Sequence, residues 1–160
     1  MMHRPVLYLE TSIFGFYYDD APRNQMRNEA VRALLQQVAA GKFRAVTSPD
    51  TIAELSAAAE PLREQLLELL SDVERPTMDE DEVGRLVSCY TEEKIAPAEF
   101  VVDLRHAAAA TVGGADVLVS LNLKHLANEW AERKINAVNL REGYRLISIR
   151  TPEEVLEYDD

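Results

Sequence analysis

The sequence predicts an α/β fold in three layers, α/β/α, around a mostly parallel sheet of about four to five strands. Short apolar runs, which are typical of strands buried on both faces, alternate with longer segments in which apolar residues recur at helical spacing. This alternation is the pattern of a parallel sheet covered by helices. The chain has 160 residues, of which 47% are hydrophobic, enough for one core. We therefore predict a single domain over residues 1–160.

The first elements follow from an apolar run and from helical periodicity. Residues 5–9 are apolar and are bounded by Pro5 and Thr11-Ser12, so we expect a buried strand there. We expect a loop over residues 15–22. Apolar residues at helical spacing then predict a helix over residues 24–40, and Gly41 ends it.

The middle of the chain is expected to be mainly helical. A short strand over residues 45–47 leads into Ser48-Pro49, a helix N-cap followed by proline at the first helical position. The helix that starts there carries Glu54. Pro61 begins another helix, with leucines at helical spacing as far as Leu70, and a further helix covers about residues 79–94.

The last third returns to the strand–helix alternation. Pro97 begins a helix that ends at Gly113-Gly114, and the third strand follows over residues 116–120. Residues 123–142 are expected to be largely helical and to precede a last strand over 145–149. The candidate core positions in residues 123–142 are Leu126, Trp130, Ile135 and Val138. A final helix is expected after Thr151-Pro152, which are a capping residue and a first-turn proline.

The charge distribution argues against a broad basic surface for nucleic acid. The formal net charge is −11, and residues 50–100 contain 14 acidic against 4 basic residues. Phosphate backbones favour basic surfaces. We interpret the acidic block as a solvated helical face, with a partner-facing surface as the alternative. The last third of the chain is more mixed in charge, with Lys124, Arg133, Lys134, Arg141, Arg145 and Arg150, so RNA would approach away from the acidic helices.

The chain is expected to reside in the cytoplasm. Its single cysteine, Cys89, excludes an internal disulfide and fits a reducing compartment. We find no secretory signal pattern at the N-terminus, where a strand begins almost at once. Apolar runs stay well short of the roughly 20 residues that a membrane span needs, so no membrane partner is expected.

Four side chains are expected to gather at one edge of the sheet. Glu10 and Asn122 follow the first and third strands, and ligands of open α/β sheets bind at the carboxyl ends of strands. Glu54 and Asp103 lie near helix starts, from which they can project over the same edge. Clustered carboxylates repel one another, so their gathering indicates a site for a hard cation. Asp116 precedes the third strand and is expected at the opposite edge.

These residues predict metal-assisted phosphate chemistry. Glu10, Glu54 and Asp103 are the candidate catalytic residues, and together with Asn122 they are the candidate ligands of Mg²⁺ or Mn²⁺. Several neighbours have two interpretations, one in the site and one in the structure. Thr11 and Ser12 can bond to a metal-bound water or to a neighbouring carboxylate, or cap a helix. His106 can position phosphate or water or be structural, and His125 can contact the phosphate or the scissile bond, or be a helix cap or a surface residue.

The ordered set of these motifs resembles a PIN domain over nearly the whole chain. The resemblance is carried by the segments Leu9-Glu10-Thr11-Ser12, 51–55 (TIAEL), 103–109 (DLRHAAA), 114–122 (GADVLVSLN) and Lys124-His125-Leu126. It implies a Rossmann-like nuclease fold with an acidic pocket that holds Mg²⁺ or Mn²⁺ and cleaves single-stranded RNA. Many small members resemble the VapC toxins of toxin–antitoxin pairs, which implies a homodimer and a small antitoxin protein as partners.

Two positions depart from the family pattern and keep a second function open. Glu10 stands where aspartate is usual, and Asn122 stands where the fourth acid is expected, which removes one negative charge. A PIN-like domain that binds RNA or protein without cutting is therefore the alternative to a nuclease. A receiver or phosphatase fits poorly, because Glu10 is followed by Thr11 and Ser12 rather than a second acid. The glycine-rich turn of dinucleotide-binding proteins is missing.

Aromatic residues beside the first candidate ligand add one more alternative. We expect them to pack in the core or in an interface, although exposed rings near the site would also stack RNA bases. They are Phe14, Phe16, Tyr17 and Tyr18.

Overall fold

A parallel sheet of four strands forms the centre of the molecule. The computed structural model describes residues 4–157, and within them the strand order is β2-β1-β3-β4, all parallel. This confirms the predicted α/β class. The strands are β1 (Val6–Leu9), β2 (Arg44–Val46), β3 (Val117–Val119) and β4 (Ser148–Arg150). The α-helices are α1 (Thr11–Tyr17), α2 (Gln25–Ala39), α3 (Pro49–Ser56), α4 (Leu62–Glu68), α5 (Glu80–Glu92), α6 (Val101–Val112), α7 (Glu129–Arg141) and α8 (Pro152–Leu156).

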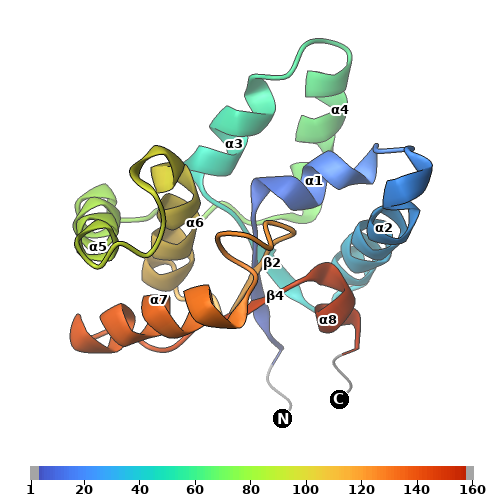
Figure 1. The fold of residues 1–160 in the computed structure, drawn as a ribbon. Coiled ribbons are helices and arrows are strands. Elements are labelled where there is room, and N and C mark those ends of the chain that lie inside the picture. The colour runs from blue at the N-terminus through green and yellow to red at the C-terminus, as the bar shows by residue number, and fades with distance from the viewer. Residues whose placement is uncertain (1–3, 158–160) are drawn as a thin grey trace.

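Helices cover both faces of the sheet and create two apolar cores. Successive strand residues point to opposite faces, so Tyr8 packs with α5, α6 and α7 while Leu7 and Leu9 pack with the helices of the other face. Figure 1 shows α5, α6 and α7 on one side of the strands and α2 and α8 on the other, with α3 and α4 beyond the carboxyl ends of the strands. This is the predicted three-layer arrangement.

The strand register brings together the residues that follow β1 and β3. Leu9 pairs with Val119, and the backbone N–H of Glu10 donates to the carbonyl of Val119 over 3.2 Å. Glu10 and Ser120 therefore lie side by side just past the paired strands. At the other end, Val6 donates its N–H to Asp116 Oδ2 over 2.8 Å. Asp116 thus lies at the amino edge of the sheet, as predicted.

Three predictions about local structure are wrong. Half of the segment expected as a loop over 15–22 is helical, since residues 15–17 belong to α1 and Pro22 begins a 3₁₀ turn over Pro22–Asn24, because Glu10 caps a helix that continues through Gly15. Residues 123–128 are turns, so the helix begins only at Glu129. Trp130, expected in the core, is 66% exposed, since the buried face of α7 is formed by Ala131, Ile135 and Val138.

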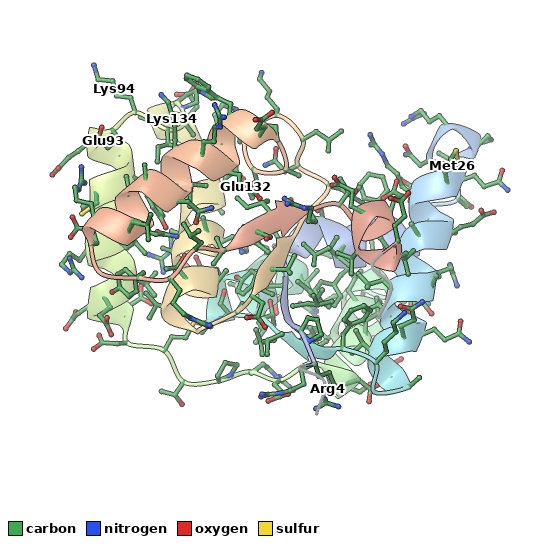
Figure 2. All side chains as sticks on the ribbon, turned by 90° about the horizontal axis from the view of Figure 1, so that it is seen from below. Arg4, Met26, Glu93, Lys94, Glu132 and Lys134 are labelled. Carbon is green, nitrogen blue, oxygen red and sulfur yellow. The ribbon has the colours of Figure 1, made fainter. Side chains whose placement is uncertain are left out.

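The outer edge of β4 is covered by side chains of α7 instead of another strand. Asn136 donates through Nδ2 to the carbonyl of Ile147 over 2.8 Å and accepts the Ile147 N–H through Oδ1 over 2.9 Å. Glu132 accepts the N–H of Ile149 over 2.6 Å. Figure 2 shows Glu132 on the side of α7 that faces β4, with Lys134 across the helix from it. The side chains thereby satisfy backbone groups that an open edge leaves exposed.

Among the helices of residues 4–157, none combines the length and the apolar character needed to cross a membrane.

Candidate active site

Glu10 is held in place by hydroxyl groups from two parts of the chain. Its Oε1 accepts hydrogen bonds from Ser12 Oγ (2.6 Å) and Ser120 Oγ (2.7 Å), and its Oε2 accepts the backbone N–H of Ser12 (3.1 Å). The last of these bonds makes Glu10 the N-cap of α1. Glu10 is only 7% exposed, so the serine hydroxyls replace the water that would otherwise solvate its carboxylate.

Glu54, on α3, bonds both to Thr11, the first residue of α1, and to His106 on α6. Its Oε1 accepts a hydrogen bond from Thr11 Oγ1 over 2.9 Å and lies 2.7 Å from His106 Nε2. The other ring nitrogen of His106, Nδ1, lies 2.8 Å from the hydroxyl of Tyr8, which in turn lies 2.6 Å from Ser48 Oγ. A chain of hydrogen bonds therefore runs from Thr11 through Glu54, His106 and Tyr8 to Ser48, the N-cap of α3.

Asp103 and Asn122 are joined through His125. Asp103 Oδ2 lies 3.0 Å from His125 Nδ1, and Asn122 Oδ1 accepts the backbone N–H of His125 over 3.1 Å. The N–H of Asn122 in turn donates to Ser120 Oγ over 2.9 Å. The imidazole of His125 also contacts the ring of Phe100, with centroids 4.1 Å apart. This branch of hydrogen bonds leads from α6 through the loop after β3 to the residues around Glu10.

These contacts form two hydrogen-bonded groups of side chains at the carboxyl edge of the sheet, and we call the two groups together the polar network. All three predicted carboxylates belong to it, and so do the four residues whose roles the sequence left open. Asp103 and His106, three residues apart on α6, connect its two branches because positions i and i+3 share a helix face. The members of the polar network are Tyr8, Glu10, Thr11, Ser12, Ser48, Glu54, Asp103, His106, Ser120, Asn122 and His125.

The open alternatives for four of these residues now have a structural answer. Ser12 and Thr11 bond directly to the carboxylates of Glu10 and Glu54. His106 is 1% exposed and has a partner on each ring nitrogen, so it is a structural histidine as well as a neighbour of Glu54. His125 is not a helix cap. It lies in the turn after Asn122, and its imidazole lies within hydrogen-bond distance of Asp103.

Charge interactions within the polar network favour an ion pair between His106 and Glu54. Burial disfavours the charged imidazole, but the hydrogen bond to Glu54 and the charges of Glu10 and Glu54 outweigh it, so the pKa of His106 is raised. Burial likewise opposes ionisation of Glu54, but its bond to His106 and the charge of that ring lower its pKa. Burial raises the pKa of the Tyr8 hydroxyl, which keeps it protonated as a donor.

The donor set suits a hard cation in its chemistry, but the side chains are engaged with one another. Carboxylate and amide oxygens are the ligands that Mg²⁺ prefers. Within residues 4–157, however, no group of three or more His, Cys, Asp or Glu side chains is arranged to hold a metal ion. The hydrogen bonds found for Glu54 and Asp103 go to Oε1 and Oδ2, so each carboxylate has a second oxygen with which to bind a further ligand.

The sequence did not indicate three buried polar members of the polar network. Ser120 is fully buried and bonds to Glu10, while Tyr8 and Ser48 extend the network beneath His106. A partial signal was present for Ser120, because it is the first polar residue after an apolar strand and precedes Asn122 by two positions. Tyr8 carried no such signal, since an aromatic residue inside a strand is typical of any sheet.

Neither a scan of the chain against protein-family models nor a search of curated proteins gave a match.

Proposed function

We propose that this chain is a metal-dependent endoribonuclease of the PIN type that cleaves single-stranded RNA. One observation carries the proposal: Glu10, Glu54 and Asp103, which lie far apart in the sequence, lie at the carboxyl edge of the sheet in two hydrogen-bonded groups, which helix α6 joins through Asp103 and His106. Ligands of open α/β sheets bind at that edge. Acids gathered there can hold a divalent cation, and that cation balances the negative charge of the scissile phosphate.

Mg²⁺ or Mn²⁺ would be held by Glu10, Glu54, Asp103 and Asn122. When bound, such an ion supplies a water of lowered pKa and polarises the scissile phosphate. Ser12 and Ser120 fix the orientation of the Glu10 carboxylate through their hydroxyls. Asp103 or Glu54 orients the attacking water in line with the scissile bond, and the resemblance implies products with a 3′-hydroxyl and a 5′-phosphate.

The biological role that fits this activity is the toxin of a toxin–antitoxin pair. The support for it is the resemblance to the VapC toxins. A homodimer and a small antitoxin protein in the cytoplasm are the partners that follow from the role. A short reading frame for a DNA-binding protein directly upstream of this one would support it, and an unrelated neighbourhood would weaken it.

The nuclease is tested by cleavage of labelled single-stranded RNA with Mn²⁺ and with EDTA. Asp103→Asn and Glu54→Gln keep the side-chain shape but remove a charge, so each should lower the rate at least about 100-fold. Asp116→Asn is the matched control, because it makes the same change at the opposite edge of the sheet. It should leave the rate close to that of the unaltered protein. Cleavage that survives in Asp103→Asn would show that another residue, or a contaminant, does the chemistry.

A binding module without catalysis is the second candidate, and one feature favours it. Glu10 is nearly buried, and three hydrogen bonds engage its two oxygens, which makes it a poor ligand without rearrangement. The two candidates differ in their response to metal. A nuclease should gain thermal stability with millimolar Mn²⁺ and lose that gain in Asp103→Asn, because a ligand that binds only the folded state stabilises it. RNA binding with no such gain would favour the binding module.

A further inference from the structure

The single tryptophan of the chain lies on the surface. Trp130 is the second residue of α7 and is 66% exposed, whereas Ala131 next to it is 4% exposed. Large aromatic side chains contribute most when their apolar area is covered, and tryptophan is enriched where surfaces bind a partner. An exposed indole at the start of a well-formed helix therefore points to a ligand that covers it.

A cation accompanies this indole. The ammonium of Lys134, one helical turn after Trp130, lies 4.7 Å from the ring centroid. Lys134 and Lys124 make no ion pair among residues 4–157, whereas Arg141, Arg145 and Arg150 of the same third of the chain all do. Their two positive charges are therefore available to an anionic ligand.

Asn128 ties this surface to the polar network. Its Nδ2 donates to the carbonyls of Leu123 (2.8 Å) and Lys124 (3.1 Å), and its Oδ1 accepts the N–H of Ala131 (2.8 Å). The turn that carries Lys124 is thereby fixed against the first turn of α7. The same turn contains Asn122 and His125, which belong to the polar network. Trp130 therefore lies directly after the turn that carries Asn122 and His125 of the polar network.

We propose that Trp130, Lys134 and Lys124 form a subsite that binds the RNA strand outside the scissile bond. The indole stacks on one unpaired base, and the two ammonium groups contact the flanking phosphates. This inference rests on the proposed function, because it takes single-stranded RNA as the ligand. An apolar protein surface would strip water from Lys134 without compensation, whereas a strand of bases and phosphates uses both the ring and the cations.

Binding is measured in EDTA, so that cleavage plays no part, with an oligouridine of about ten nucleotides, within the range of strand lengths that such sites cover. Since Trp130 is the only tryptophan, its fluorescence reports directly on this position, and we expect saturable quenching. Trp130→Ala should weaken binding by about 5- to 150-fold, the range for loss of one base–aromatic stack. Trp130→Phe should restore most of the affinity.

Two control variants distinguish the subsite from general effects on the fold. Leu140→Ala removes a 60% exposed apolar side chain from the other end of α7 and should leave the affinity unchanged. Lys134→Ala should lower the slope of log affinity against log salt by about 0.7, the loss of one phosphate contact on a single strand. Lys42 also rests on an aromatic ring, that of Phe43, but it lies before β2 at the opposite edge. Lys42→Ala should therefore leave that slope unchanged.

The outcomes separate this inference from the nuclease proposal. Equal RNA affinity in the unaltered protein and Trp130→Ala, or binding without any change in tryptophan fluorescence, would overturn the subsite even if the protein cleaves RNA. Quenching by RNA in a protein that never cleaves with Mn²⁺ would overturn the nuclease and support the subsite. RNA that does not bind at all would overturn the subsite.

Discussion

Each acid of the polar network has a partner that stabilises its charge at this edge of the sheet. Glu10 relies on serine hydroxyls, Glu54 on the imidazole of His106 and Asp103 on that of His125. Hydrogen bonds to charged groups contribute about 1.5–3 kcal/mol each. The partners therefore allow several carboxylates to gather in a folded protein, and they also compete with any cation for the same oxygens.

The pair of His106 and Glu54 should make stability depend on pH. The folded pKa of His106 lies above its usual 6.5, so its contribution is complete below that pH and is lost as the pH rises through the raised pKa. The folded pKa of Glu54 lies below its usual 4.5, so its contribution is complete above that pH and is lost as the pH falls through the lowered pKa. The pair should thus stabilise the fold fully between about pH 4.5 and pH 6.5, the usual pKa values of the two groups.

This pH dependence is measured by urea unfolding in EDTA, with His106→Gln as the comparison. Glutamine keeps a donor at the position but carries no charge, so the difference in free energy of unfolding should be largest between the two values above. It should shrink as the pH rises through the raised pKa of the imidazole, where the ring loses its proton. A difference that stays constant over the whole range would contradict an ion pair at this position.

At the scale of elements, two helices have consequences beyond packing. Helix α1 begins at the N-cap Glu10, so the residue proposed as a metal ligand also initiates a helix. Helix α7 covers the edge of β4 with Asn136 and presents Trp130 to solvent. Each helix thus connects the sheet to a surface with a proposed function.

Gly15 in α1 should be replaceable by alanine with a gain in stability. It is exposed, and a Cβ built there meets no atom within 4 Å. Alanine is favoured over glycine inside a helix by about 0.5–1 kcal/mol, and thermal unfolding should show this gain. Gly113→Ala is the contrasting variant, because its Cβ would lie 2.9 Å from the carbonyl oxygen of Ala109 and from Met78. It should destabilise the protein, and a loss of stability in Gly15→Ala would contradict the helix.

Asn136→Ala should expose the edge of β4. The change leaves the N–H and the carbonyl of Ile147 without their partner, and an unsatisfied buried group costs about 1–3 kcal/mol. Urea unfolding should show a loss of this size, and size-exclusion chromatography should show increased self-association. Arg133→Ala, on the exposed side of the same helix, should change neither. Unaltered stability in Asn136→Ala would mean that water replaces the side chain at no cost.

At the scale of the whole molecule, one sheet lies between two apolar cores and contributes side chains to both. Leu9 belongs to the core with α1 and α2, and Leu118 to the core with α5, α6 and α7. Both are fully buried. Since the neighbouring strands β1 and β3 carry the two residues, damage to one core should be transmitted to the other through the sheet.

Leu9→Ala and Leu118→Ala should each lower the free energy of unfolding by about 2–5 kcal/mol. Both variants should still unfold in one transition by circular dichroism and by calorimetry, as a single domain over residues 1–160 requires. Leu140→Ala, at a 60% exposed position, should have little effect. A second transition in either core variant would show that the two faces of the sheet unfold independently, which contradicts the single domain.

The order of the elements was predictable because local patterns encode it. Apolar runs such as 5–9 and caps such as Ser48-Pro49 predicted strands and helix starts that the structure contains. The class of the fold and the placement of Glu10 and Asp116 at opposite edges followed from them. Residues 15–17, the last turn of α1, were predicted incorrectly as part of a loop. The reason is that a glutamate N-cap and a glycine inside a helix are both weak local signals.

The sequence by itself determined the parallel α/β architecture and which acids lie at the carboxyl edge of the sheet. Only the tertiary structure decided how those acids are paired, because the contacts of Glu10 with Ser120 and of Glu54 with His106 join residues 110 and 52 positions apart. It also decided that Trp130 faces solvent rather than the core. Periodicity marks one face of a helix as apolar, but which residues are buried depends on where the helix meets the sheet.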